Sequence, residues 1–259
     1  MNKSKIYNLL FFGFLLTFTS CKEPGCTDKN AINFNIEANQ DDNSCIYNSE
    51  LNINFKLVNE NLNFAKYDTI SGNGYTFRMM NMKFYLSDIQ IQTHETNIPL
   101  KDVHLFNIDN EDTHNLNFEI QEDRYTGINF NIGLNPTQNS TTPSEYELNH
   151  PLGLNQNTFW AMEPASYIFV IIEGKIDTSL DNNFYNLTYH LAHDDLIRNI
   201  NLYKEINVSN NQAYTINIEI DVSNIFNNVD FSDELPHQRI ATPLAHLLID
   251  NFSSTFEIH

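Results

Sequence analysis

Basic residues, cysteine and tryptophan are scarce in this chain. Its 259 residues include 14 Lys and Arg against 33 Asp and Glu, 3 Cys and 1 Trp, and the formal net charge is −19. A surface this acidic repels nucleic acid and anionic lipid headgroups, so we expect no nucleic-acid partner. The sequence also lacks a nucleophile elbow, a P-loop and a dinucleotide fingerprint, and no acid–base–nucleophile set is visible. We therefore expect a protein that is not an enzyme.

Only one long apolar run is present, and it lies at the N-terminus. Residues 6–18 follow the basic Lys3 and Lys5 and fall short of the about 20 residues that a membrane-spanning helix needs. This pattern predicts a signal peptide over residues 1–20. Small residues then precede Cys21, an arrangement that resembles a lipobox and predicts acylation of this cysteine. The alternative is an ordinary signal peptide followed by a free cysteine.

The lipobox interpretation predicts an outer-membrane lipoprotein, periplasmic or cell-surface, that contacts the membrane through lipid on Cys21 only. If Cys21 carries lipid, Cys26 and Cys45 remain to pair with each other. An oxidising compartment permits that bond. Closing this loop would contribute roughly 3 kcal/mol in the chain-entropy model. We expect a lipid-anchored, disulfide-closed segment over residues 21–50.

This segment resembles a cysteine-bracketed module that is common in secreted bacterial proteins. Its oxygen donors, Asp28, Asn30, Asp41 and Asp42, are hard ligands that suit Ca²⁺. The spacing is not that of an EF-hand. A disulfide-closed spacer without metal is the alternative to a Ca²⁺ site, and both interpretations stay open.

Residues 51–259 alternate between apolar and polar positions in many short runs, which predicts strands. The runs are residues 51–57, 84–91 with an irregularity in the middle, 116–120, 128–132 and 216–222. Residues 167–172 are apolar throughout and predict a central strand. The fold class is therefore all-β, an antiparallel β-sandwich of the Ig-like or jelly-roll-like kind. Thr242 followed by Pro243 predicts the start of a short C-terminal helix over residues 243–252.

Several segments of this domain resemble, in order, the motifs of the MbnP-like copper-binding proteins. They are residues 83–89 (KFYLSDI), 125–133 (YTGINFNIG), 150–153 (HPLG), 159–160 (FW), 167–174 (YIFVIIEG), 189–191 (YHL), and His237 with residues 243–251. The chain departs from the pattern at three places: Met162 replaces a second Trp, Ala165-Ser166 replaces the usual Ser-Gly or Asn-Gly, and Ala192 replaces a Gly. The resemblance covers nearly all of the MbnP-like β-sandwich domain at residues 51–259.

The resemblance implies a copper-binding protein for copper sequestration or acquisition. It implies a metal site at His190, His237, His150 and Trp160, with Trp160 as a candidate for oxidation to kynurenine by a di-haem peroxidase-like partner. Imidazole ligands suit copper. The alternation over residues 184–191 puts His190 on the polar face of its strand, where a ligand can sit. His150 could instead be a turn residue that packs near Trp160.

Sequence proximity alone suggests partners for a ligand histidine. Asp194, Asp195 and Asp233 are candidates to orient a ligand histidine, because such a ring needs an acceptor for its other N–H. Glu173 is interpreted as structural, at the end of the central strand. Four histidines without matching context are expected at the surface: His94, His104, His114 and His259. His246 falls opposite the apolar stripe of the predicted helix, so we expect it to be exposed to solvent. The alternative function is a metal-free surface β-sandwich that acts as a protein-interaction module.

Overall fold

The computed structural model describes residues 22–72, 74–162, 164–231 and 242–259, and the backbone of residues 237–238. The predicted signal peptide and the lipidation of Cys21 lie outside these residues. The chain divides into two compact units, Met1–Tyr47 and Asn48–His259. No helix in the described ranges has both the length and the apolarity to cross a membrane.

The first unit is small and is closed by the predicted disulfide. Cys26 and Cys45 are bonded, with their Cα atoms 4.8 Å apart, so this prediction is confirmed. Two short strands, β1 (Pro24–Gly25) and β2 (Gln40–Asp41), pair in parallel. The carboxylate of Asp28 accepts hydrogen bonds from the Asn30 amide at 2.9 Å and the Tyr47 hydroxyl at 2.7 Å. The Asp28 carboxylate thus accepts hydrogen bonds from donors within this unit, which stabilise the disulfide-closed segment.

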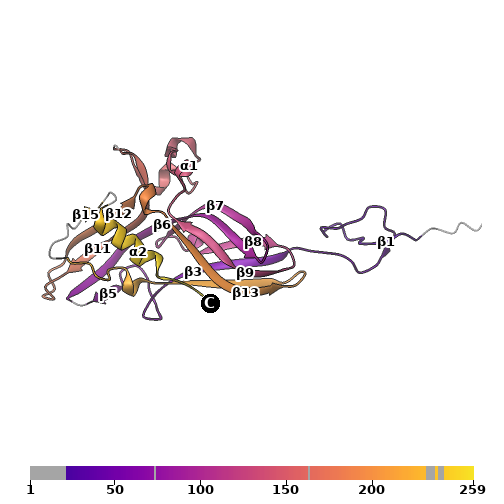
Figure 1. Ribbon diagram of the computed structural model, residues 1–259, viewed down its shortest axis with the longest axis horizontal. Coiled ribbons are helices and arrows are strands. Elements are labelled where there is room, and N and C mark those ends of the chain that lie inside the picture. Colours follow the sequence, from indigo (N-terminus) through magenta and orange to yellow (C-terminus); the bar gives the residue numbers. More distant parts are fainter. Residues whose placement is uncertain (1–21, 73, 163, 232–236, 239–241) are drawn as a thin grey trace, which may run out of the picture. The chain divides into compact units, whose positions relative to one another are not determined.

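The second unit is a β-sandwich, as predicted (Figure 1). Within the described residues one sheet has nine strands, in the order β13-β9-β6-β11-β12-β15, with β5 and β7 also on β6 and β10 on β11. These strands are β5 (Thr69–Gly72), β6 (Tyr75–Thr93), β7 (Asn97–Asn107), β9 (Asp123–Ile132), β10 (Phe159–Trp160), β11 (Ser166–Asp177), β12 (Tyr185–Ala192), β13 (Arg198–Val208) and β15 (His237–Gln238).

The other sheet has five strands in the described part, ordered β16-β14-β3-β4, with β8 also on β3. They are β3 (Ser49–Asn59), β4 (Leu62–Asn63), β8 (Asn115–Ile120), β14 (Ala213–Asp221) and β16 (Phe256–Ile258). Most pairs are antiparallel, but β3–β14 and β12–β15 are parallel. A parallel pair needs a long crossover. The chain between β3 and β14 supplies one, since it builds most of the nine-stranded sheet.

Strand β6 is the longest described strand and joins the two halves of its sheet. Its first half pairs with β5 and β11, and its second half pairs with β7 and β9. The break falls at Asp88, whose φ is +52°. This residue lies between Leu86 and Ile89, where the alternation of the sequence predicts an irregularity. The Asp88 carboxylate accepts hydrogen bonds from Asn131 and Asn135, which holds the bend.

Aromatic side chains fill the space between the sheets. Phe55 of β3 meets Phe130 of β9 with ring centroids 6.4 Å apart, which joins one sheet to the other. Phe84 stacks on Phe106 at 4.5 Å and also contacts Phe252 of the C-terminal helix at 5.1 Å. Burying each such ring contributes about 1.5–3 kcal/mol. The alternate, apolar positions of the strands therefore build one continuous core.

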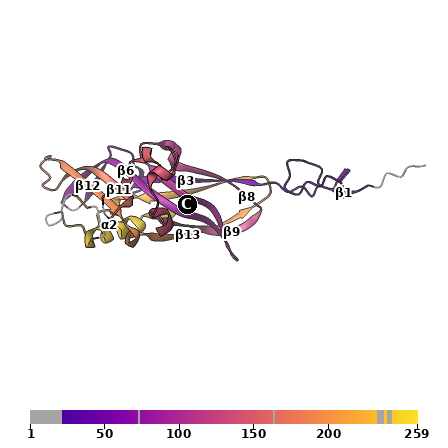
Figure 2. The same cartoon turned by 90° about the horizontal axis from the view of Figure 1, so that it is seen from above.

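The predicted C-terminal helix is α2 (Pro243–Ser253), which is yellow in Figure 2 and contacts β12 and β13. The Thr242 side chain accepts a hydrogen bond from the Ala245 amide and caps its start. Leu244, Leu248 and Phe252 are buried. The described part also has one short α-helix, α1 (Pro136–Asn139), and five 3₁₀ helices: η1 (Glu111–His114), η2 (Pro143–Glu145), η3 (Leu154–Gln156), η4 (Asp194–Leu196) and η5 (Val222–Asn224).

Candidate functional site

Three strands bring a polar cluster together on the outer face of the nine-stranded sheet. In β11, Ile171 pairs with Lys83 of β6 and with His190 of β12. Two residues along, Glu173 pairs with Asn81 of β6. Directly opposed residues share a face, and alternate residues of one strand do as well. The side chains of Lys83, His190, Glu173 and Asn81 therefore gather on one face, away from the core.

Glu173 is the centre of this cluster. One of its carboxylate oxygens lies 2.7 Å from Nε2 of His190, and the other accepts a hydrogen bond from the Asn81 amide at 2.9 Å. The hydrogen bond with His190 holds the pKa of Glu173 below its usual value, and Asn81 and the positive charge of Lys83 act in the same direction. The carboxylate is therefore ionised at neutral pH.

The ionised carboxylate decides the tautomer of His190. It can only accept hydrogen bonds, so Nε2 of His190 carries the hydrogen and donates it. In the neutral ring the lone pair then lies on Nδ1. This nitrogen is buried and has no hydrogen-bond partner in the described part of the chain. A buried polar atom without a partner costs about 1–3 kcal/mol, so the structure holds a nitrogen donor ready for a ligand at a cost in stability.

The other polar atoms of the cluster are Oδ1 of Asn81 and the ammonium nitrogen of Lys83. Oδ1 of Asn81 is also buried without a hydrogen-bond partner among the described residues. The Lys83 ammonium donates a hydrogen bond to the Gln156 carbonyl at 2.8 Å. Burial lowers the pKa of Lys83, and the charge of Glu173 opposes this effect. Lys83 thus links the cluster to η3.

His237 lies in β15, which pairs in parallel with β12. The backbone of His237 is opposite Thr188, two residues before His190. From the strand spacing and the rise per residue, the Cα atoms of His237 and His190 are about 8 Å apart. The side chain of His237 and residues 232–236, including Asp233, lie outside the described set. The shared site of His190 and His237 therefore stays a prediction.

His150 has the contacts of a turn residue. Its Nδ1 accepts a hydrogen bond from the Leu152 amide at 3.1 Å, and its ring stacks on Tyr146 with centroids 4.5 Å apart. Burial lowers the pKa of His150, so the ring is neutral. With Nδ1 accepting, Nε2 must carry the hydrogen and has no free lone pair. These contacts favour the turn interpretation and do not support His150 as a ligand.

The segment that carries His150 is fixed to the sheet by two buried tyrosines. The Tyr85 hydroxyl donates to the Pro151 carbonyl at 2.8 Å, and the Tyr167 hydroxyl donates to the Leu152 carbonyl at 2.9 Å. A Cβ atom at Gly153 would lie 2.2 Å from the Glu147 carbonyl oxygen, so this position requires glycine. The contacts of residues 150–153 with the sheet therefore give the HPLG motif a structural role.

Trp160 belongs to a different strand from His190, and both strands pair with β11. It is in β10 and pairs with Ser166, whereas His190 pairs with Ile171. Five residues along a strand span about 16 Å. The register therefore separates the backbones of Trp160 and His190 along β11, and a metal site that includes Trp160 stays a prediction. The motifs alone carry no information on which strands pair, or where.

Sequence reasoning misplaced Glu173 within its strand. Strand β11 does not end at Glu173 but continues to Asp177. The Asp194 carboxylate, one of the expected partners of a ligand histidine, accepts a hydrogen bond from Asn139 instead. A signal was available, because a carboxylate inside an otherwise apolar central strand needs a partner on the neighbouring strands.

His104 is not at the surface, contrary to expectation. It is 7% exposed, lies against the Phe55 ring with centroids 6.3 Å apart and has Nε2 2.7 Å from the Thr113 carbonyl. Burial lowers the pKa of His104 to about 4. His114 likewise stacks on Phe106, at 4.5 Å. Both rings are parts of the structure and not candidate ligands.

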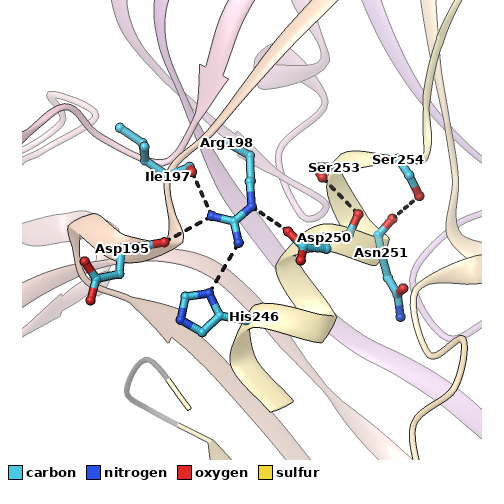
Figure 3. Close-up of polar contacts among 8 residues, drawn as sticks. All are labelled: Asp195, Ile197, Arg198, His246, Asp250, Asn251, Ser253 and Ser254. Atoms are coloured by element: carbon cyan, nitrogen blue, oxygen red, sulfur yellow. Dashed lines mark hydrogen bonds and ion pairs between the residues drawn. The ribbon is translucent and has the colours of Figure 1, made fainter. Parts of the chain in front are cut away.

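His246 is also more engaged than expected. Figure 3 shows it on α2 beside Arg198, whose guanidinium lies 3.3 Å from His246 Nδ1 and 2.5 Å from the Asp250 carboxylate. The next residue, Asn251, donates hydrogen bonds to the carbonyls of Ile225 and Asn227. The Asp-Asn pair of the motif therefore fixes α2 to the sandwich.

No group of three or more His, Cys, Asp or Glu side chains that could hold a metal ion occurs among the residues whose placement the structure gives. A complete site around His190 Nδ1 would need donors beyond them. The geometry thus defines a β-sandwich protein with one oriented histidine donor on its outer sheet face.

Comparison with known proteins identifies the family. The family MbnP matches residues 48–242, and the chain belongs to this family. Among solved structures, MbnP from Methylosinus trichosporium is similar, with a TM-score of 0.49 and 10% sequence identity over 75% of this chain and 81% of that chain. No curated protein sequence matches the chain.

Proposed function

We propose that this MbnP-family protein binds copper through Nδ1 of His190. The observation that carries the proposal is the 2.7 Å contact between Nε2 of His190 and Glu173, since it directs the lone pair of the ring to a buried nitrogen without a partner. A ligand histidine whose other N–H is held by a carboxylate is a recurrent arrangement at metal sites. Imidazole suits copper, and Cu²⁺ binds nitrogen sites more tightly than other divalent first-row ions.

His237 is the second proposed ligand, because its backbone pairs with β12 next to the His190 position. Asn81 has a buried oxygen in the same cluster, but neutral oxygen is a poorer donor for copper than imidazole. Trp160 and His150 are left out of the proposed site for the reasons given above. Oxidation of Trp160 and a di-haem peroxidase-like partner are thereby separate proposals that the cluster does not require.

The proposed role is sequestration or acquisition of copper outside the cytoplasm. The predicted signal peptide and lipid on Cys21 would hold the protein at the outer membrane, periplasmic or cell-surface. The net charge of −19 raises the local concentration of cations.

The test is elemental analysis combined with intact mass, on full-length protein expressed with its own leader in copper-supplemented cells. We expect copper in stoichiometric amount, removable by a chelator and restored on reloading. If the protein neither carries nor takes up copper, the proposal fails. A metal-free interaction module, which the lack of a three-residue donor group in the described residues favours, would then be the better account. Zinc alone in the protein would contradict the choice of metal.

Intact mass also tests the anchor. We expect a lipid mass on the fragment that begins at Cys21, and release of Cys21→Ser protein from the membrane fraction. Unchanged fractionation of this variant, with no lipid mass in the wild type, would leave the free-cysteine alternative. The Cys26–Cys45 disulfide should be intact in both proteins.

A further inference from the structure

A cavity lined by two positively charged side chains, Arg78 and Lys175, lies elsewhere on the same sheet. Its volume is about 460 Å³, and it is lined by Tyr67, Asp68, Thr69, Arg78, Met80 and Lys175. Small-molecule sites are of this size, about 300–1,000 Å³. Lys175 follows Glu173 by two residues in β11, so it lies on the outer face, and it pairs directly with Arg78 of β6.

The two cations have no ionic partner in the described part of the chain. Like charges that are directly opposed across two strands destabilise a sheet. The chain has 33 Asp and Glu residues against 14 Lys and Arg, so carboxylates are plentiful. Lys66, which precedes Tyr67 of the cavity, does have an ionic partner, the Asp109 carboxylate at 2.8 Å. Asp68 also lines the cavity, and one of its oxygens accepts a hydrogen bond from the Ala65 amide. An opposed Arg–Lys pair that forms no ion pair in the described residues, although Asp68 lines the same cavity, points to an external anion.

The wall of the cavity is fixed in place. The guanidinium of Arg78 lies over the Phe184 ring, 5.3 Å from its centroid, which orients the side chain and leaves its N–H groups for a ligand. The Tyr67 amide donates to the Met79 carbonyl at 2.8 Å, and the Met79 amide donates to the Asp68 carbonyl at 3.0 Å. The 58% exposed Tyr67 and the thioether of Met80 supply apolar surface beside the cations.

We propose that this cavity binds a small organic oxyanion, a carboxylate or a phosphate ester with an apolar portion. The planar guanidinium of Arg78 can bind such a group with two N–H bonds, and Lys175 adds a second positive charge. The apolar portion packs on Tyr67 and Met80. This site is independent of the proposed copper site, since none of its lining residues belongs to the His190 cluster.

Calorimetric titration of the full mature protein with four probes tests the proposal. The probes are benzoate, phenyl phosphate, inorganic phosphate and the neutral benzamide. We expect saturable binding of benzoate or phenyl phosphate, weaker binding of inorganic phosphate and none of benzamide. The comparison of benzoate with phenyl phosphate assigns the carboxylate or the phosphate as the preferred oxyanion. Equal heats for benzoate and benzamide, or no saturable binding of either anion, would overturn the proposal.

Substitution locates the binding. Arg78→Gln and Lys175→Gln should each weaken the anion about tenfold to a hundredfold, as expected for charge-assisted hydrogen bonds. Arg124→Gln is the matched control, because Arg124 lies on β9 of the same sheet and is paired with Glu205 at 2.8 Å. It removes the same charge and should leave binding unchanged. Equal loss in all three variants would indicate a general charge effect and contradict the site. Amide shifts of Thr69 and Lys175 on titration of the wild type provide a readout that does not depend on any variant.

Discussion

The clearest contrast in this molecule is between two regions. One is the strand cluster of Asn81, Lys83, Glu173 and His190, and the other is the docked segment, residues 150–153, which Tyr85 and Tyr167 hold against the sheet. Both histidines lie in MbnP-like motifs, and both rings are half-buried. Nδ1 of His150 accepts an amide hydrogen at 3.1 Å, whereas Nδ1 of His190 is buried without a partner in the described residues. The neighbour of each ring therefore decides whether a lone pair is available. Sequence motifs identify the histidines but not their tautomers.

Substitution of the two histidines should separate these regions most strongly. His190→Ala should lower copper affinity by more than the roughly 10–100-fold that loss of an outer-sphere partner costs, because it removes a ligand. His150→Ala should leave the affinity unchanged. Competition titration with a chromophoric chelator measures both variants. Equal losses would mean that the docked segment contributes to the site.

A third histidine, His104, extends the contrast to the core. Burial lowers its pKa to about 4, against 6.5 for an exposed ring. The unfolded chain therefore binds the proton more readily, and stability is full above pH 6.5 and is lost as the pH falls towards 4. The loss is about 3 kcal/mol from this ring alone.

Urea unfolding at a series of pH values measures this loss. His104→Gln, which has no titratable ring, should show a flatter profile between pH 6.5 and 4. If the free energy of unfolding of the variant has the same dependence on pH as the wild type, His104 does not have a lowered pKa in the folded protein.

Glu173→Gln tests why the His190 region differs. The amide keeps the shape of the side chain but removes the charge that fixes the His190 tautomer. Copper affinity should fall about 10–100-fold, less than in His190→Ala. Glu119→Gln, on the other sheet, is the control for loss of one negative charge. If Glu173→Gln binds copper as the wild type does, the carboxylate does not orient the ring.

Tyr85→Phe should give the smallest effect. It removes the hydrogen bond to Pro151 and the 2.6 Å contact with Thr158, and we expect a loss of about 1 kcal/mol in the free energy of unfolding. Copper affinity should not change, because the docked segment is outside the proposed site. Thermal unfolding and the chelator titration measure the two quantities. A large drop in copper affinity would connect the docked segment to His190.

Much of the fold could be predicted from the alternation of apolar and polar residues. The strands at residues 51–57 and 216–222, the break near Asp88 and the helix after Thr242 all follow local rules that act over a few residues. The disulfide follows from counting cysteines, because Cys26 and Cys45 remain to pair if Cys21 carries the predicted lipid. These features depend on near neighbours in the sequence.

The site could be predicted only in part, for the same reason. The alternation placed His190 on the polar face of β12, and the structure agrees. Its partner Glu173 is 17 residues away and is brought close by antiparallel pairing, whose register is not visible in one sequence. His104 was misplaced because the end of β7 is covered on both sides, with residues 103–106 all buried.

The most direct test of the account concerns the two nitrogens of His190. Long-range ¹H–¹⁵N correlation spectra of ¹⁵N-histidine-labelled protein distinguish protonated, free and metal-bound ring nitrogens. Before metal is added, Nε2 of His190 should be protonated and Nδ1 should not. On addition of Cu(I), the Nδ1 signal of His190 should shift while both His150 signals stay in place. Binding through Nε2 of His190, seen as loss of its N–H, or a shift at His150 alone would contradict the account.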